Sequence, residues 1–464
     1  MPAKKKPAAK KPAAKKAPVK KAPVKKPVAK KTAKSAAKKQ KNYSLLRGMK
    51  DVRPKDSEHW MALMNASQDI AEAYGYKYIE PPVLEQAQLF IRTIGKGTDV
   101  IDKEMYVFED KDGTKVGLRP EFTAGVVRSY IAHGMHSMPQ PVKTWYFGQL
   151  FRHDRPQAGR QRQFHQFGAE VIGMRDPVID AELISVAYNY LRDLGLSTEV
   201  HINSIGSLED RQNYLVELVG YLRSKRSYLS DESKKRLTKN PLRILDSKDE
   251  GDREVVAEAP QIIDWLSAES KNYFMKVLEY LDELQIPYVL APTLVRGLDY
   301  YTDTVFEIFS EDNGESGSQS ALCGGGRYDG LVEQLGGPAG TPACGFSVGV
   351  ERVLSKYRQL QEAKEAPTKR EGIYFAQLGV QARRRALALI EQLRRAGIKM
   401  NFDLSRGSLK QQLESANKVG ASHAVIIGQK EVLDGTVIIR DMDSGIQEIV
   451  DQKKIEKEIR KIVG

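Results

Sequence analysis

The sequence predicts an α+β protein whose main body is followed by a separate α/β module. Two strand-like runs, at Trp145–Arg152 and Phe164–Val171, flank a short loop and predict an antiparallel hairpin within the main body. From about residue 372, strand-like and helix-like runs alternate, which is typical of an α/β module. A chain of 464 residues has room for about three domains and a sizeable core.

Residues 1–41 form a Lys/Ala/Pro-rich tail. They contain 17 lysines and no acidic residue, so of the chain's net charge of +13 the remainder carries 13 − 17 = −4. Lys-Lys pairs recur every five residues from Lys5 to Lys30, separated by alanine, valine and proline. Frequent proline and like-charge repulsion oppose a helix or a packed core, so we expect an extended, disordered arm that binds nucleic-acid phosphates. An inert solubility tail or an acidic partner are the alternatives.

The rest of the composition limits the class of protein. The tail lacks the apolar stretch of a secretory signal and the arginines of a mitochondrial presequence. Apolar runs of about 18 residues do not occur, so we expect no membrane association. Two cysteines, Cys323 and Cys344, are too few for a disulfide framework, which favours a reducing, cytoplasmic location.

The main body begins with a helix at about Ser57–Tyr74, where apolar residues follow helical spacing and Gly75 supplies the stop. A strand follows at Tyr76–Glu80, and Pro81-Pro82 ends it. This helix and strand alone are common and indicate no function.

The predicted hairpin carries charge inside apolar alternation. On its second strand Phe164, Gln166, Gly168 and Glu170 share one face, so one face is core and the other a candidate site. Arg152 ends the first strand, and the loop holds three more arginines, whose planar forks suit phosphate or carboxylate: Arg155, Arg160 and Arg162. We expect Gly168 to admit a ligand or another backbone. The alternative is a solvated hairpin with a basic tip.

A second polar group lies in Leu118–Gly125, before a helix-like run at Ala124–Ile131. The Glu121 carboxylate beside the Thr123 hydroxyl suits a substrate ammonium group. The alternative is a helix start in which Thr123 caps the helix and Glu121 complements its dipole.

The next segments are a helical insert and two glycine-containing motifs. Residues from about Leu208 to Gln285 are helical and highly charged, and a strand returns at Tyr288–Leu290. Leu294-Val-Arg-Gly-Leu-Asp-Tyr-Tyr301 then precedes a strand-like run at Val305–Phe309. In Ala321-Leu-Cys-Gly-Gly-Gly-Arg-Tyr-Asp-Gly-Leu331, three successive glycines occur where side chains would obstruct a bound group, although such runs usually mark loops or bulges.

The main body ends with Ala343–Val353, a small-residue strand that leads into a helix with Arg352 at its start. A charged linker is expected at about 361–371, and the α/β module spans 372–464. Its predicted strands are Ile373–Ala376, Met400–Leu404 and Ala424–Ile427, and its helices are Ala382–Ala396, Ser408–Val419 and a last one that ends at Val463. Asp434-Gly435 is expected to form a hairpin turn.

These motifs together resemble the class II aminoacyl-tRNA synthetases. The first helix and strand resemble motif 1, the hairpin Phe147–Glu170 resembles motif 2, and Ala343–Val353 resembles motif 3. Arg-Gly-Leu-Asp-Tyr-Tyr and Gly-Gly-Arg-Tyr-Asp-Gly, in this order, are similar to the signature pair of the histidyl-tRNA synthetase family. The resemblance covers about Tyr43 to the C-terminus. Phe122 stands where that family usually has glycine, which puts the local backbone in question.

The resemblance implies a fold and a set of domains. It implies a class II synthetase antiparallel β-sheet core flanked by helices at residues 42–360, with the helical insert at about 208–285. The C-terminal module resembles an anticodon-binding domain. Motif 1 implies a homodimer.

The resemblance also implies roles for particular residues. The expected catalytic residues, which stabilise the transition state, are Arg152 and Arg296. The expected histidine-binding residues are Glu121, Thr123, Gln166, Glu170, Arg296, Tyr300 and Tyr301. The expected ATP-binding residues are Arg152, Phe164 and Arg352. The expected contacts to the tRNA acceptor end are Gln157, Arg160 and Arg162.

The implied activity is ligation of histidine to tRNA(His), with ATP as substrate and Mg2+ carried by ATP rather than by a protein metal site. Two alternatives belong to other classes. One is a non-catalytic regulatory paralogue of histidine biosynthesis, which would lack Arg296 and the C-terminal module. The other is a nucleic-acid-binding protein on a degenerate synthetase fold.

Overall fold

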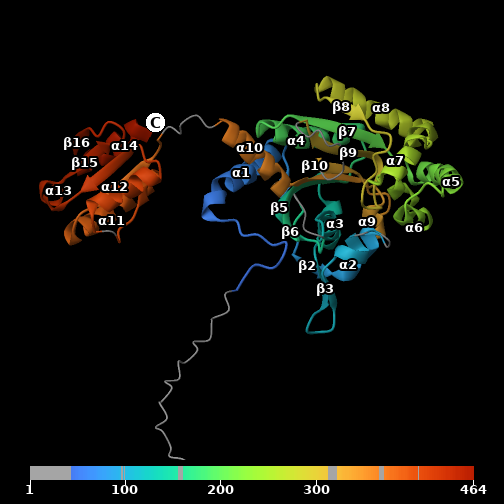
Figure 1. Cartoon of the computed structure of the whole chain (residues 1–464), viewed down its shortest axis with the longest axis horizontal. Coiled ribbons are helices and arrows are strands. Elements are labelled where there is room, and N and C mark those ends of the chain that lie inside the picture. Colours follow the sequence, from blue (N-terminus) through green and yellow to red (C-terminus); the bar gives the residue numbers. More distant parts are fainter. Residues whose placement is uncertain are drawn as a thin grey trace, which may run out of the picture. The chain divides into compact units, whose positions relative to one another are not determined.

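The computed structural model describes residues 43–463 except 96, 97, 99, 155–159, 312–320, 365–369 and 406. Its main element is an eight-stranded sheet in the order β1-β5-β6-β11-β10-β9-β7-β8 (Figure 1). The strands are β1 Lys77–Tyr78, β5 Val142–Phe151, β6 Gln163–Ile172, β7 Thr198–Ser204, β8 Tyr288–Leu290, β9 Thr302–Ser310, β10 Ala321–Arg327 and β11 Ala343–Gly349. Neighbouring strands from β5 to β7 are antiparallel, whereas β1 and β8 pair in parallel at the two edges.

The predicted hairpin is formed by β5 and β6, which pair along their whole length from Val142 opposite Ile172 to Phe151 opposite Gln163. Phe167, Ala169 and Val171 are fully buried, as the alternation predicts for the core face. In contrast, β1 is shorter than the predicted Tyr76–Glu80, because it is an edge strand and proline follows it.

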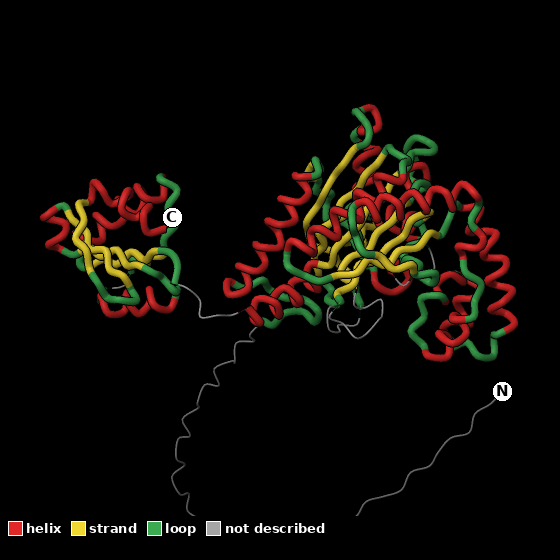
Figure 2. Tube along the Cα trace, turned by 90° about the horizontal axis from the view of Figure 1, so that it is seen from above, coloured by secondary structure: helices red, strands yellow, loops and turns green. Residues whose placement is uncertain are grey.

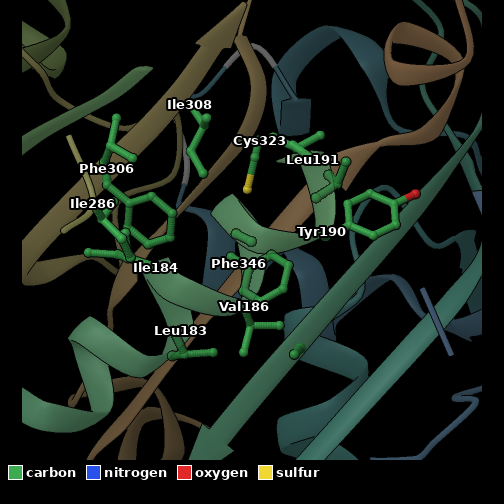
Figure 3. Packing of buried hydrophobic residues seen from close by; sticks show 14 of the residues in the cluster. Leu183, Ile184, Val186, Tyr190, Leu191, Ile286, Phe306, Ile308, Cys323 and Phe346 are labelled. Carbon is green, nitrogen blue, oxygen red and sulfur yellow. The ribbon is translucent and has the colours of Figure 1, made fainter. Parts of the chain in front are cut away.

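Long helices pack against the sheet, as Figure 2 shows. They are α1 Ser57–Ala73, α3 Thr123–Ala132, α4 Pro177–Asp193, α8 Ala268–Glu283 and α10 Val350–Lys364. One cluster joins α4 to the strands through Leu183, Tyr190, Phe306 and Phe346, with Cys323 among them (Figure 3). A second cluster places Phe122, from the start of α3, with Tyr300, Tyr301 and Tyr328. Each of the two apolar clusters therefore joins residues from early and late parts of the main body's sequence.

The residues between β7 and β8 are helical, as predicted for the insert. They form α5 Leu208–Ser224, α6 Asp231–Lys239, α7 Glu250–Ala257 and α8, with short 3-10 turns at Pro241–Ile244 and Ile262–Trp265. Ser207 and Asp210 make a reciprocal capping box at the start of α5, which explains why the helix begins there.

A three-stranded sheet in the order β2-β4-β3 lies before the hairpin in sequence. Its strands are β2 Leu84–Gln86, β3 Val107–Glu109 and β4 Lys115–Leu118, and the neighbouring helices are α2 Ala87–Ile94, a π-helical turn at Val100–Glu104 and, later in sequence, α9 Leu331–Gln334.

The C-terminal module has its own five-stranded sheet, in the order β13-β12-β14-β15-β16, and its own core. Its elements are β12 Ile373–Gln377, α11 Val380–Arg395, β13 Asn401–Phe402, α12 Leu409–Lys418, β14 His423–Ile427, α13 Gln429–Asp434, β15 Thr436–Asp441, β16 Gln447–Asp451 and α14 Ile455–Val463, with a 3-10 turn at Gln452–Lys454. The strands and helices expected here are present.

Two predictions about this part of the chain are wrong. Asp434-Gly435 is a helix end rather than a hairpin turn: α13 stops at Asp434, and Gly435 adopts φ +69° as its left-handed cap. The reversal between β15 and β16 falls later, where Gly445 has φ +73°. The expected linker also starts too early, because α10 continues to Lys364. In the described part of the chain, helices long and apolar enough to cross a membrane are absent.

Candidate active site

A cavity of about 350 Å3 opens on the face of the large sheet formed by β6, β9, β10 and β11. Most of the predicted site residues line it together, although they come from segments up to 231 positions apart, from Glu121 to Arg352. Those lining it are Glu121, Thr123, Arg152, Arg160, Phe164, Gln166, Arg296, Tyr300, Tyr301 and Arg352. Glu170 and Arg162 are not part of its wall, and Gln157 lies outside the described residues.

Glu121 supplies a buried carboxylate at the start of α3. One oxygen, Oε1, accepts the Ala124 N–H at 2.8 Å, whereas Oε2 is buried with no hydrogen-bond partner among the described residues. Burial raises the pKa of Glu121, and the hydrogen bonds from the backbone of Ala124 and Thr123 oppose this. An unpartnered carboxylate oxygen at a cavity wall suits an ammonium group.

Thr123 lines the cavity but does not cap the helix. Its hydroxyl donates to Glu170 Oε1 at 2.7 Å instead of capping the helix, and Glu121 takes the capping role. Phe122 has φ −95°, which any residue adopts, so its presence in place of glycine causes no backbone strain. Its ring stacks on Tyr146 at 4.1 Å and lies under the Arg119 guanidinium.

Glu170 lies beneath the cavity on β6 and is 1% exposed. It accepts hydrogen bonds from the hydroxyls of Thr123, Tyr146 (3.1 Å) and Tyr328. Burial raises the pKa of Glu170 to about 8, although these hydroxyls lower it. Gly345 is required beside it, because a Cβ there would lie 1.5 Å from Glu170 Oε2.

Arg296 forms an ion pair with Glu307 on β9. Although burial acts in the opposite direction, the ion pair with Glu307 raises the pKa of Arg296. Its Nε is buried without a hydrogen-bond partner among the described residues, and its guanidinium lies 5.7 Å from the Tyr301 ring. The Arg296 guanidinium lies directly on β10 at Gly324. A Cβ at Gly324 would come within 2.4 Å of it, so this approach requires glycine.

Tyr300 and Tyr301 form an aromatic wall, with ring centroids 4.8 Å apart and side chains less than 9% exposed. Burial raises the pKa of both phenols, so they stay protonated and can donate hydrogen bonds near neutral pH.

The hairpin and the start of α10 add the remaining cations. Arg152 donates from Nε to the Pro120 carbonyl at 2.9 Å, and its guanidinium lies 5.4 Å from the Phe164 ring. Arg352 donates to the Ala321 carbonyl at 2.6 Å. Burial lowers the pKa of Arg352, and the nearby guanidiniums of Arg160, Arg152 and Arg296 add to this effect. Such a group of like charges suits a polyanion.

The two described arginines expected at the acceptor end differ in their surroundings. Arg160 forms an ion pair with Asp154 at 2.7 Å and lines the cavity. The Arg162 side chain packs against Gly48, where a Cβ would lie 2.7 Å from it, and Arg162 also donates from its backbone to the Gly48 carbonyl. Arg162 is therefore held by the body of the protein.

The glycines in the motifs make room for protein groups rather than directly for a ligand. A Cβ at Gly168 would come within 2.5 Å of the Tyr146 hydroxyl and the Phe346 carbonyl. In the glycine run, Gly325 lies against the neighbouring strand, and Gly326 has φ +154° and lies against Tyr301. β10 has register shifts on both sides of this run, so the strand is bulged as such runs often are.

The residues of this site that sequence reasoning missed include Tyr328, Glu307, Arg243 and Asp246. Tyr328 donates to Glu170, and Glu307 pairs with Arg296. Glu307 had a signal, since it is an acidic residue inside the apolar strand Val305–Phe309. Arg243 and Asp246, an ion pair of 3.0 Å, line the cavity from the helical insert and had no signal beyond a charged segment. Groups of three or more His, Cys, Asp or Glu placed to hold a metal are absent among the described residues.

An antiparallel sheet that holds converging arginines over a cavity, with a charged hairpin and a separate α/β module, defines the class II aminoacyl-tRNA synthetases. The histidyl-tRNA synthetase model matches residues 48–353, and the anticodon-binding domain model matches residues 373–462. The chain therefore belongs to the histidyl-tRNA synthetase family.

Individual relatives agree with this family. A histidine–tRNA ligase from Gloeothece citriformis is 44% identical over 90% of this chain and 96% of its own length. One from Thermosynechococcus vestitus is 44% identical over 89% and 95%. The crystal structure of apo S. aureus histidyl-tRNA synthetase is 34% identical, covers 90% of this chain and 99% of its own, and superposes with a TM-score of 0.74.

Proposed function

We propose that this chain ligates histidine to tRNA(His) in two steps, first forming histidyl-adenylate from histidine and ATP. The observation that carries the proposal is the cavity itself, where Arg152, Arg160, Arg296 and Arg352 surround one space whose wall also contains the half-partnered carboxylate of Glu121. The relatives named histidine–tRNA ligase support the same activity.

The first step brings two anions together. A histidine carboxylate oxygen attacks the α-phosphorus of ATP, the bond to the β-phosphate oxygen breaks, and the electron pair leaves with pyrophosphate. Because the carboxylate and the phosphates repel one another, the site must neutralise and align both. Arg152 and Arg296 would stabilise the charge at the α-phosphate. Arg352 would hold the distal phosphates, and Phe164 would stack on adenine.

Histidine would be held at both ends. Glu121, with Thr123 and Gln166, would bind the ammonium group. Three residues would recognise the imidazole: Tyr300, Tyr301 and Glu170. The free cavity does not reach the Glu170 carboxylate, so Glu170 would act through its hydrogen bond with Thr123 or after that hydrogen bond is broken. A site that pairs a substrate's polar groups can reject analogues lacking them by roughly 10⁴ to 10⁵.

In the second step the terminal ribose hydroxyl of tRNA attacks the histidyl carbonyl, and AMP leaves with the electron pair of the broken mixed-anhydride bond. Gln157, Arg160 and Arg162 would guide the acceptor end. The C-terminal module, which matches an anticodon-binding domain, would bind the anticodon arm of the tRNA. Mg2+ would enter with ATP as part of that substrate.

The assembly and location follow from the same assignment. We expect a homodimer formed through the motif 1 region. Cys323 and Cys344 are free and buried, and this supports a reducing, cytoplasmic location. The regulatory-paralogue alternative is not favoured, because Arg296 and the C-terminal module are both present. The degenerate nucleic-acid-binding alternative is not favoured either, because the charged site residues converge on one cavity.

Two assays test the proposal. Purified protein should catalyse ATP–pyrophosphate exchange that depends on histidine, and should load histidine onto tRNA(His). Exchange driven equally by other amino acids would overturn the substrate assignment. Tight tRNA binding without histidine-dependent exchange would instead favour the nucleic-acid-binding alternative.

A further inference from the structure

A second cavity, of about 310 Å3, is lined mainly by the helical insert and lies beside the first. Its polar wall is made by Asp246, Ser247, Lys248, Arg253 and Thr293, and Leu245 and Val256 add apolar surface. Asp246 lines both cavities, so the two spaces adjoin. The insert therefore supplies a pocket of its own next to the expected phosphate end of the nucleotide.

Ion pairs to the cations of this second cavity are absent in the part of the chain that the structure describes. Lys248 and Arg253 form no ion pair with the residues that the structure describes, and Asp246, the acid in the cavity wall, pairs with Arg243 instead. Asp252, which adjoins Arg253 in sequence, accepts hydrogen bonds from the hydroxyls of Ser230, Ser233 and Ser247. Asp249, which adjoins Lys248, accepts from backbone N–H groups at the start of α7. Asp246, Asp249 and Asp252 are thus engaged elsewhere, and the charges of Lys248 and Arg253 remain available to an anion.

The neighbours of Lys248 across the cavity border are also cations. Partial burial lowers the pKa of Lys248, and the charges of Arg160, Arg352 and Arg253 add to the effect, while Asp246 opposes it. Arg160 and Arg352 line the first cavity. A row of cations thus runs from the proposed triphosphate site into the insert, and such a row suits a group with several negative charges.

We propose that the second cavity is a phosphate-binding subsite that receives the pyrophosphate released from ATP, with Lys248 and Arg253 as its anchors. This inference rests on the proposed function. When the bond between the α-phosphorus and the β-phosphate oxygen breaks, pyrophosphate takes the electron pair and gains a charge. Lys248 then draws it away from Arg352, which separates the product from the adenylate.

The test is the concentration of pyrophosphate that half-saturates histidine-dependent exchange by the full chain. Lys248→Ala should raise this concentration about tenfold, as expected for removal of one hydrogen bond to a charged group. Arg253→Ala should raise it similarly, and Lys248→Arg, which keeps the charge, should restore most of the affinity. KM for histidine should change by less than about twofold in all three variants.

Lys276→Ala is the matched control, because it removes an exposed insert lysine from α8 that lines neither cavity. A half-saturating pyrophosphate concentration in Lys248→Ala equal to that of Lys276→Ala would overturn the inference. A second arm measures transfer from preformed histidyl-adenylate to tRNA(His). If only this transfer slows, the phosphate belongs to the tRNA acceptor end and the pyrophosphate assignment is wrong. If wild type shows no histidine-dependent exchange, the proposed function fails instead.

Discussion

The guanidinium of Arg296 pairs with the carboxylate of Glu307, so the cation expected to meet the α-phosphate is anchored by an acid. Glu307 is 9% exposed, and its pKa is raised by burial and lowered by Arg296. The pair fixes the orientation of the arginine against Gly324. Preorganisation of this kind is what electrostatic stabilisation of a transition state requires.

Arg296→Ala should therefore have two separable effects. Exchange should fall on the order of 10² to 10³, because the transition state is deprived of a preorganised cation. The free energy of unfolding should also fall, because Glu307 is left buried without its partner. The double variant Arg296→Ala/Glu307→Gln should regain much of the stability, measured by urea unfolding, without regaining exchange. Exchange within about threefold of wild type in Arg296→Ala would contradict the catalytic role.

Glu170 should make both stability and histidine binding depend on pH. Its folded pKa of about 8 lies above its ordinary value of 4.5, so between these values the folded state binds more protons than the unfolded state. Its contribution to the free energy of unfolding is thus present below about pH 4.5 and is lost as the pH rises toward 8. Glu170→Gln should flatten this dependence in urea unfolding measured from pH 4.5 to 8.5. An unchanged slope would show that Glu170 is ionised throughout.

The same variant should weaken histidine more than ATP, because an amide cannot replace a carboxyl group that accepts from Thr123 and Tyr328 and is expected to read the imidazole. The increase in KM for histidine should be larger at pH 8.5 than at pH 6.5, since glutamine resembles the neutral acid. Equal increases in KM for both substrates would assign Glu170 a purely structural role.

The hairpin arginines should differ from each other. Arg160→Ala should harm aminoacylation more than pyrophosphate exchange, because it lines the cavity and its expected partner is the acceptor end. Arg162→Ala should in addition lower the midpoint of thermal unfolding, because its side chain packs on Gly48. Both steps measured for both variants check this, and equal damage to the two steps by Arg160→Ala would reject its role toward tRNA.

The sequence was sufficient for features that depend on local patterns. The β5–β6 hairpin, the helix at Ser57–Ala73 and most of the C-terminal module follow from periodicity of apolar residues and from glycine stops. Edge strands such as β1 were overestimated, because their length depends on pairing that the local pattern does not contain. Asp434-Gly435 was misread because the same dipeptide suits a hairpin turn and a helix C-terminus.

Residues of the cavity could be predicted where they belong to a recognisable motif. Interactions with residues from distant parts of the chain could not. Glu121 and Arg352 were found through their motifs. The Arg296–Glu307 pair and the Tyr328–Glu170 hydrogen bond required the register of the sheet, which no single segment encodes. Arg243 and Asp246 were missed because a charged helical insert offers no pattern that separates a cavity wall from a solvated face.

The lysine tail, residues 1–41, lies outside the described residues, and its expected role rests on charge alone. Its 17 lysines can bind phosphates but offer no rigid donor geometry for base edges, so binding should be driven by counterion release. Deleting residues 1–41 should leave histidine-dependent exchange unchanged, because the residues that line the cavity begin at Val100.

The deletion should weaken cognate and non-cognate tRNA by similar factors, because phosphates carry no sequence information. The slope of log affinity against log salt should flatten by about 0.7 to 0.9 for each phosphate that the tail no longer neutralises. Filter binding of both tRNAs over a range of salt concentrations measures this, with a variant whose tail lysines are replaced by glutamine as a length-matched control. Loss of counterion release must change the salt slope. If affinity and salt slope are both unchanged after deletion, the tail does not act through the phosphate backbone.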